Sequence, residues 1–167
     1  MRGTIKVRIC AIFAILALLA GLTLISGSAA ETTSGSDIAI VVNSDNAVNN
    51  LSMTELRRIF RGERQYWSSN SPVVLLMHAP GARERDVILR TVLQMSEEDY
   101  TQYWVAKIMR AEASFPPTAV FSYSMVGEGI RGNRGAIGYV VANEVPPGLK
   151  VLQVDGILPG KPGYPLR

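Results

Sequence analysis

The sequence has 167 residues, 47% of them hydrophobic and 19% charged, which is typical of one globular domain and excludes a disordered polyelectrolyte. The single cysteine, Cys10, excludes a disulfide framework, and the single histidine, His78, excludes a multi-histidine zinc site. Residues 1–30 hold three of the seventeen basic residues and no acid, so the remainder carries 14 basic and 14 acidic residues. The net charge of +3 therefore gives no support to nucleic-acid binding.

The first thirty residues have the pattern of a secretory signal peptide. Basic residues are followed by an apolar run over 9–25 and by small residues at Ser28 and Ala30, where a signal peptidase would cut. An uncleaved amino-terminal membrane anchor is the alternative, because seventeen apolar residues are close to the length that crosses a bilayer. We predict that residues 1–30 are a cleaved signal peptide and that the protein is periplasmic or secreted.

The next elements alternate between strand and helix. Residues 31–37 read as a flexible arm, and the apolar run that follows predicts a strand through Asn43, covered on both faces. After an Asn-rich loop, Ser52 and Glu55 form the pattern of a capping box, which predicts a helix that ends at Gly62.

A second strand is predicted over 72–77, and the turn that follows leads into a helix over 83–94. Ser96 and the acids after it predict the start of a third helix that runs to about Arg110.

The carboxyl-terminal third is expected to begin with a linker at Phe115-Pro116-Pro117. It continues with a weaker, glycine-containing helix over 123–131, a strand over 135–141 and a last strand over 149–154. Residues 156–167 are rich in Pro and Gly and are expected to form an extended tail. Alternation of strands and helices over 38–155 predicts one three-layer α/β domain with a mostly parallel sheet and flanking helices.

No motif of the sequence indicates catalysis, a cofactor or a metal. A Gly-x-Ser-x-Gly elbow and a Walker loop are both missing, and no serine is an evident partner for His78. The adjacent acids Glu97, Glu98 and Asp99 begin a predicted helix, where negative charge stabilises the positive end of the helix dipole. We therefore predict that the protein is not an enzyme.

The turn Pro80-Gly81-Ala82-Arg83 is the sharpest candidate for ligand binding. A strand leads into a glycine turn and then into a helix, and the free amides at a helix start attract anions. We predict that Gly81, Ala82 and Arg83 bind an oxyanion, with His78, Asn43 and Ser44 as neighbours at strand ends, and Arg85 as a further donor. The alternative is an ordinary strand–helix turn with solvated arginines.

Four arginines crowd the helix segment 57–64. Such a run could meet nucleic acid, anionic lipid or an acidic partner, but no RNA-binding signature surrounds it. We interpret it as a solvated helix face with some ion pairing.

Several stretches in the same order resemble the periplasmic phosphate-binding proteins of ABC transporters, the PstS-like substrate-binding proteins. These stretches are Ile38–Asn43, Leu51–Gly62, Trp67, Gly135–Val140 and Val154–Leu166. The resemblance implies one lobe of a type II periplasmic-binding-protein fold, standing alone as the family's second lobe. It also implies phosphate or a similar oxyanion as ligand, and a transporter permease or a periplasmic protein as partner.

Two departures from the family bear on function. The family's Ser-Gly-Thr turn corresponds to Pro80, Gly81 and Ala82, so both hydroxyl groups and one amide hydrogen are lost. The first lobe's ligand-binding residues have no counterpart. We therefore expect weak oxyanion binding or, alternatively, a non-binding interaction or regulatory module with the same fold; a homodimer is also open.

Overall fold

The computed structural model describes residues 37–113 and 115–167, which belong to one compact unit. The predicted signal peptide and residues 31–36 of the predicted arm lie outside the described residues. Within the described part, none of the helices has the length and apolar character needed to cross a membrane.

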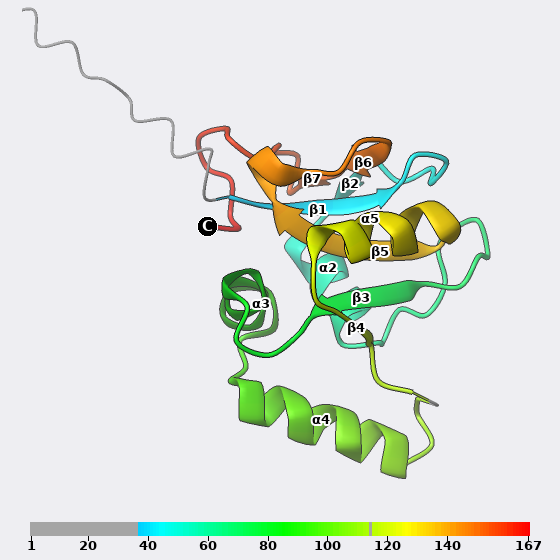
Figure 1. Cartoon of the computed structure of the whole chain (residues 1–167). Coiled ribbons are helices and arrows are strands. Elements are labelled where there is room, and N and C mark those ends of the chain that lie inside the picture. The colour runs from blue at the N-terminus through cyan, green and yellow to red at the C-terminus, as the bar shows by residue number, and fades with distance from the viewer. Residues whose placement is uncertain (1–36, 114) are drawn as a thin grey trace, which may run out of the picture. The chain divides into compact units, whose positions relative to one another are not determined.

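A five-stranded sheet forms the middle layer, in the order β4-β3-β5-β1-β6 (Figure 1). Its strands are β1 (Ile38–Asn43), β3 (Val74–His78), β4 (Thr118–Val120), β5 (Ala136–Val141) and β6 (Leu149–Val151). β1 is antiparallel to both of its neighbours, whereas β3 is parallel to β4 and β5. Four strands therefore run in one direction, which confirms the mostly parallel sheet. A separate parallel pair joins β2 (Asn50–Leu51) to β7 (Gln153–Val154).

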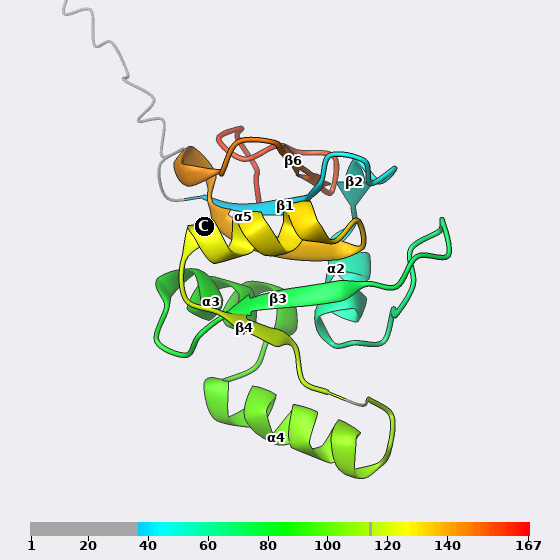
Figure 2. The ribbon, with the colours of Figure 1, turned by 45° about the vertical axis from the view of Figure 1, so that its right-hand side comes forward.

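Helices cover both faces of this sheet (Figure 2). One core cluster joins the sheet to α2 (Met53–Phe60), α3 (Arg83–Val87), the π-helical segment η2 (Ile88–Leu93) and α4 (Glu97–Met109). The other cluster joins it to α5 (Tyr123–Gly132). A 3-10 turn, η3 (Ala142–Glu144), follows β5. The three-layer α/β expectation is confirmed, and every residue of β1 and β5 is buried as expected for strands covered on both faces.

Local sequence signals set two of the helix starts. Ser52 and Glu55 form a complete capping box at α2, and Ser96 and Asp99 form one at α4, as the sequence predicts. The predicted helix over 83–94 is instead divided into α3 and η2, and it ends at Gln94 in the left-handed conformation with φ 55°.

The arginines of α2 make structural contacts. Arg57 Nε donates to the Val92 carbonyl at 2.6 Å, and Arg61 Nη2 donates to the Leu93 carbonyl at 3.3 Å. Both acceptors lie at the carboxyl end of η2, where carbonyls lack helical partners. Arg57 and Arg61 therefore bond to the end of a neighbouring helix rather than to solvent alone, whereas Arg64 pairs with Glu55 at 3.3 Å, in line with the expected ion pairing.

Other predicted boundaries also change. The predicted linker leads directly into β4, which the sequence analysis missed because only three residues form it. The last predicted strand is interrupted at Leu152, where the chain passes from β6 to β7. Asp37 is not part of a loose arm: it is 1% exposed, and its Oδ2 accepts a hydrogen bond from the Gly160 amide at 2.7 Å.

The Pro/Gly-rich tail contains no helix and no strand of either sheet, yet it packs into the core. Tyr164 and Leu166 are buried. The Tyr164 hydroxyl donates to the Ile38 carbonyl at 2.7 Å, and the Ile38 amide donates to the Leu166 carbonyl at 2.8 Å. These bonds hold the end of the chain against the start of β1.

Two glycines lie where another part of the chain comes close. A Cβ on Gly135 would lie 1.9 Å from the Pro72 carbonyl oxygen, at the point where β5 enters beside β3. A Cβ on Gly129 would lie 2.9 Å from a Leu76 methyl, so the glycine lets α5 pack closely on the sheet. At Gly129 the residue type that weakens α5 as a helix thus gives room to the Leu76 side chain.

We predict that Gly135→Ala lowers the free energy of unfolding by about 2 kcal/mol or more, because the backbone carbonyl of Pro72 must move to admit the methyl group. Gly132→Ala is the matched control, since no atom lies within 4 Å of its Cβ position and alanine favours a helix. Urea unfolding measures both. Equal stabilities for the two variants would contradict the packing assigned to Gly135.

Candidate functional site

The predicted anion turn lies where β3 ends and α3 begins. Gly81 has φ +88°, a conformation that favours glycine, and Ala82 is the N-cap of α3 without any side-chain hydrogen bond. The first helical bond runs from the Asp86 amide to the Ala82 carbonyl at 3.2 Å. The amides of Arg83, Glu84 and Arg85 therefore have no helical acceptor, which is the condition for an anion-attracting helix start.

One predicted donor is already engaged. The Ala82 amide donates to the Ala79 carbonyl at 3.3 Å, within the turn itself. Gly81 is exposed, and a Cβ built on it would meet no atom within 4 Å. The turn is therefore open to solvent on the Gly81 side. The Ala82 amide, in contrast, helps to close the turn and is not available to a ligand.

Glu84 lies at this helix start and was not singled out from the sequence. Its carboxylate accepts hydrogen bonds from the Tyr123 hydroxyl and from its own backbone amide. Burial opposes the charged form, but these hydrogen bonds outweigh it and hold the pKa of Glu84 below its ordinary value. A negative group of the protein thus occupies part of the region that would attract an external anion.

Arg85 is buried and joins three elements. Its Nε and Nη2 donate to the two carboxylate oxygens of Glu97 at 2.7 Å each, and its Nη1 donates to the His78 carbonyl at 2.7 Å. Its guanidinium also lies over the Tyr100 ring, 5.0 Å from the centroid. Burial disfavours the charged guanidinium, yet the Glu97 carboxylate raises the pKa of Arg85. The arginine therefore ties β3 to α4, and the expectation that it contacts a ligand is wrong.

His78 ends β3 beside this cluster and is 4% exposed. Its Nε2 lies 3.0 Å from the Tyr139 carbonyl oxygen, which can only accept, so Nε2 is the donor. Its backbone amide donates to the Tyr139 hydroxyl at 3.1 Å, and its ring contacts those of Tyr123 and Tyr139. Burial raises the pKa of Tyr139, so that hydroxyl stays protonated. His78 is therefore held by Tyr139 at the end of β3, where the turn begins.

Asn43 and Ser44 lie at the opposite end of the sheet. β1 is antiparallel to β5, and β3 is parallel to β5, so the carboxyl end of β1 points away from the carboxyl end of β3. The Asn43 amide donates to the Ile130 carbonyl at 2.8 Å, at the end of α5. The structure therefore does not bring Asn43 and Ser44 together with His78, Gly81, Ala82 and Arg83.

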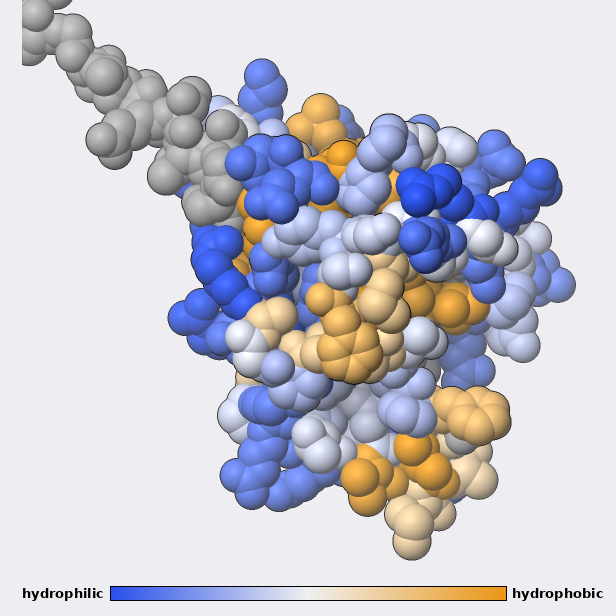
Figure 3. All heavy atoms as spheres, viewed as in Figure 1, coloured by the Kyte–Doolittle hydropathy of each residue, from blue (hydrophilic) through white to orange (hydrophobic). Residues whose placement is uncertain are grey.

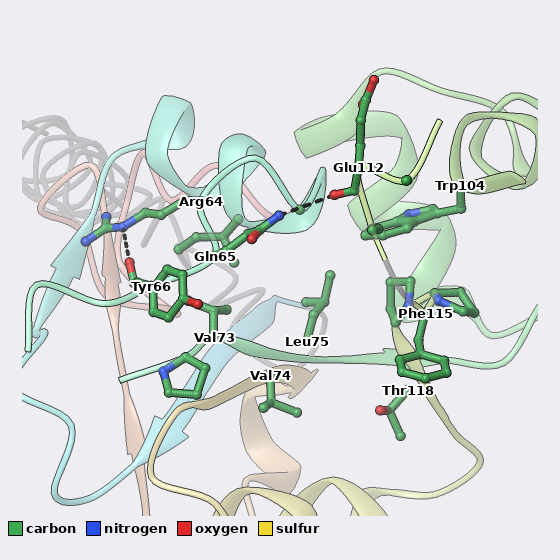
Figure 4. Close-up of a pocket in the computed structure, with 17 residues that line it drawn as sticks. Arg64, Gln65, Tyr66, Val73, Val74, Leu75, Trp104, Glu112, Phe115 and Thr118 are labelled. Atoms are coloured by element: carbon green, nitrogen blue, oxygen red, sulfur yellow. Dashed lines mark hydrogen bonds between the residues drawn. The ribbon is translucent and has the colours of Figure 1, made fainter. Parts of the chain in front are cut away.

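A separate cavity of about 660 Å³ opens at the other ends of β3 and β4 (Figure 4). Aromatic side chains line it, including Trp104 and Phe115, and Gln65 Nε2 donates to the Glu112 carbonyl across it at 3.4 Å. Arg64 in its wall pairs with Glu55 at 3.3 Å.

The described residues contain no cluster of three or more His, Cys, Asp or Glu side chains that could hold a metal.

Comparisons with known proteins identify the class of this fold. The PBP superfamily domain matches residues 35–160, and the chain therefore belongs to the PBP superfamily. Its fold is that of one lobe of a type II periplasmic-binding protein. No curated protein matches the sequence at a comparable level.

Solved structures share the fold at low sequence identity. One is a candidate phosphate ABC transporter substrate-binding protein from Clostridium perfringens with bound phosphate, at 20% identity and TM-score 0.60, covering 74% of this chain and 46% of that one. Another is an ABC-type phosphate transport receptor from Vibrio cholerae, at 19% identity and TM-score 0.60, with coverages of 74% and 48%. PstS from Borrelia burgdorferi aligns at 18% identity and TM-score 0.57, with coverages of 74% and 49%. The chain matches about half the length of each of these proteins.

We predict that Arg85→Ala lowers the free energy of unfolding by about 2–3 kcal/mol, because the His78 carbonyl and Glu97 lose a buried partner. Arg85→Lys should restore little of the lost stability, since an ammonium group cannot replace the bidentate hydrogen bond to Glu97. Arg110→Ala is the control: its bond to Glu112 is as short, 2.6 Å, but both side chains are exposed, so the loss of stability should be much smaller than for Arg85→Ala. Similar losses for Arg85→Ala and Arg110→Ala would contradict the role assigned to Arg85.

Proposed function

We propose that the protein is an exported binding domain that takes phosphate or another small oxyanion weakly at the start of α3. The observation that carries the proposal is the start of α3, where the N-cap Ala82 makes no side-chain cap and the first helical bond is donated by the Asp86 amide. This helix start lies at the carboxyl ends of parallel strands, where open α/β sheets bind ligands. The names of the solved relatives, which are phosphate transport proteins, support the same ligand class.

Binding at this turn is expected to be weak, with a Kd of about 1 mM. The turn offers main-chain amides without the hydroxyl groups that serine or threonine would add, because Pro80 and Ala82 stand there. The carboxylate of Glu84 already accepts a hydrogen bond from its own amide at this helix start. Each effect removes a charge-assisted hydrogen bond from an incoming anion.

Export and transport are proposed on separate grounds. The basic and apolar pattern of residues 1–30 supports an exported protein, with a cleaved signal peptide or a membrane anchor. An ABC transporter permease or another periplasmic protein would then be the partner. The family's role in substrate binding supports a function in recognition rather than catalysis.

One observation favours a second candidate, a non-binding interaction or regulatory module. Glu84 already places a carboxylate on the helix start and is fixed there by Tyr123. When a carboxylate of the protein itself lies at the helix start, the helix does not need an external anion for its stability. Calorimetry distinguishes these two functions.

We predict that Glu84→Gln strengthens oxyanion binding about five- to tenfold, because the change removes the competing negative charge and keeps the side-chain shape. Isothermal titration with phosphate and with sulfate measures it. Asp86→Asn is the matched control, since Asp86 is an exposed acid of the same helix turn. We expect a smaller gain for this control.

The outcomes separate the two proposed functions. If neither the unaltered protein nor Glu84→Gln releases heat at millimolar phosphate or sulfate, oxyanion binding is excluded and the interaction module is favoured. Equal gains for Glu84→Gln and Asp86→Asn would indicate a general charge effect and contradict a seat at the amides.

The competition by Glu84 should also depend on pH. Because its pKa lies below the ordinary value of 4.5, the carboxylate is fully charged at neutral pH and competes fully there. As pH falls below about 4.5, protonation removes the charge, and sulfate, which stays ionised, should bind more tightly. Glu84→Gln should abolish this rise, and a rise that persists in the variant would assign it to another group.

A further inference from the structure

A groove of about 330 Å³ runs between α4 and the sheet. One face of α4 forms the first wall, with residues that recur at helical spacing: Tyr100, Thr101, Trp104, Val105 and Ile108. Met77 of β3, Ala119 of β4 and the two prolines before β4 belong to the second wall. Figure 3 shows apolar side chains over the carboxyl half of α4. The groove is therefore mostly apolar, and its volume is near the lower end of the range for ligand pockets.

Two polar atoms of the residues in the first wall are buried without a hydrogen-bond partner. Tyr100 is 4% exposed and Trp104 is 7% exposed, and among the described residues neither Tyr100 Oη nor Trp104 Nε1 has a partner. An indole N–H can only donate, so Trp104 cannot accept the proton of the Tyr100 hydroxyl although the two groups are neighbours. A buried donor without an acceptor is costly, because it has given up its hydrogen bonds to water. These two donors therefore point to a guest that supplies an acceptor.

The charge around the Tyr100 hydroxyl indicates what kind of acceptor fits. Burial raises the pKa of Tyr100 and outweighs the opposite effect of the Arg85 guanidinium, so the hydroxyl stays protonated and donates. Arg85 lies over the Tyr100 ring, but the Glu97 carboxylate already pairs with its charge. The groove thus offers two donors and no unpaired positive charge. An uncharged oxygen acceptor suits it better than an anion, which would be costly to bury there.

We propose that this groove binds a small uncharged molecule that has an apolar body and one carbonyl oxygen. The carbonyl oxygen accepts a hydrogen bond from the Tyr100 hydroxyl and, through its second lone pair, another from Trp104 Nε1. The apolar body lies between Ile108 and Ala119 and displaces water from both walls. A water molecule could satisfy the same donors, but it would leave the apolar walls wet.

This site differs from the proposed oxyanion site in its chemistry. Its donors are two aromatic side chains, whereas the oxyanion would meet the start of α3. Inorganic phosphate has no apolar body, and a neutral carbonyl compound has no charge for a helix start to attract. Either proposal can therefore fail alone.

The test follows the indole N–H signals of the ¹⁵N-labelled full chain, recovered after export, during a titration with acetophenone. The sequence contains two tryptophans, and Trp104→Phe assigns their signals. We expect the Trp104 signal to shift and to saturate with a Kd of about 1 mM, because so small a ligand gains limited free energy. Trp67 is the internal control: its Nε1 donates to the Gly135 carbonyl at 2.9 Å, so its signal should stay in place.

Matched variants and ligands test the hydrogen bond. Tyr100→Phe removes the hydroxyl and keeps the ring, so it should weaken acetophenone binding at least about fivefold. Tyr103→Phe is the control and should leave binding unchanged, because the Tyr103 hydroxyl donates to the Arg61 carbonyl and Tyr103 does not line the groove. Ethylbenzene lacks the carbonyl group and benzoate is charged, so both should bind more weakly than acetophenone.

Urea unfolding separates lost binding from lost folding. Tyr100→Phe should be at least as stable as the unaltered protein, because its hydroxyl has no partner to lose, whereas Tyr103→Phe should be less stable. Three results would each overturn the proposal: a Trp104 signal that stays in place up to the solubility limit of acetophenone, an equal affinity for ethylbenzene, or unchanged binding in Tyr100→Phe. The first of them would assign the two donors to water.

Discussion

Arg85 lies in α3, and its guanidinium bonds to the last residue of β3 and to the first turn of α4. A buried guanidinium must keep all of its partners, because an unpaired charge in the interior is costly. The contact therefore fixes the angle at which α3 leaves the sheet and the place where α4 starts. The start of α3 and the position of α4 both depend on this one arrangement.

The turn combines two opposing features. The start of a helix at the end of a parallel strand is the kind of position that attracts an anion, and this is the site that we propose. Its own Glu84, bonded to Tyr123, supplies a negative charge at the same place. At a helix start without hydroxyl donors, an internal carboxylate competes strongly with an external anion. The chain itself holds this carboxylate in place, so it loses little entropy on binding. The same geometry can thus serve a weak receptor or a protein that no longer needs a ligand.

Much of the fold could be predicted because local chemistry specifies it. Ser52 and Ser96 begin helices through capping boxes, and the apolar runs of β1 and β5 require strands that are covered on both faces. β4 could not be predicted in this way. It is three residues long, and its pairing with β3 depends on contacts that no local pattern encodes.

The sequence by itself determined the α/β class, the strand–turn–helix at Pro80 to Arg83 and the apolar character of residues 9–25. Only the tertiary structure decided which polar residues meet. Asn43 ends a strand as His78 does, but β1 runs antiparallel to its neighbours, so the two residues lie at opposite ends of the sheet. Likewise Arg85 pairs with Glu97 rather than with a ligand. Strand direction and side-chain partners arise from packing between distant segments, and one-dimensional spacing does not contain them.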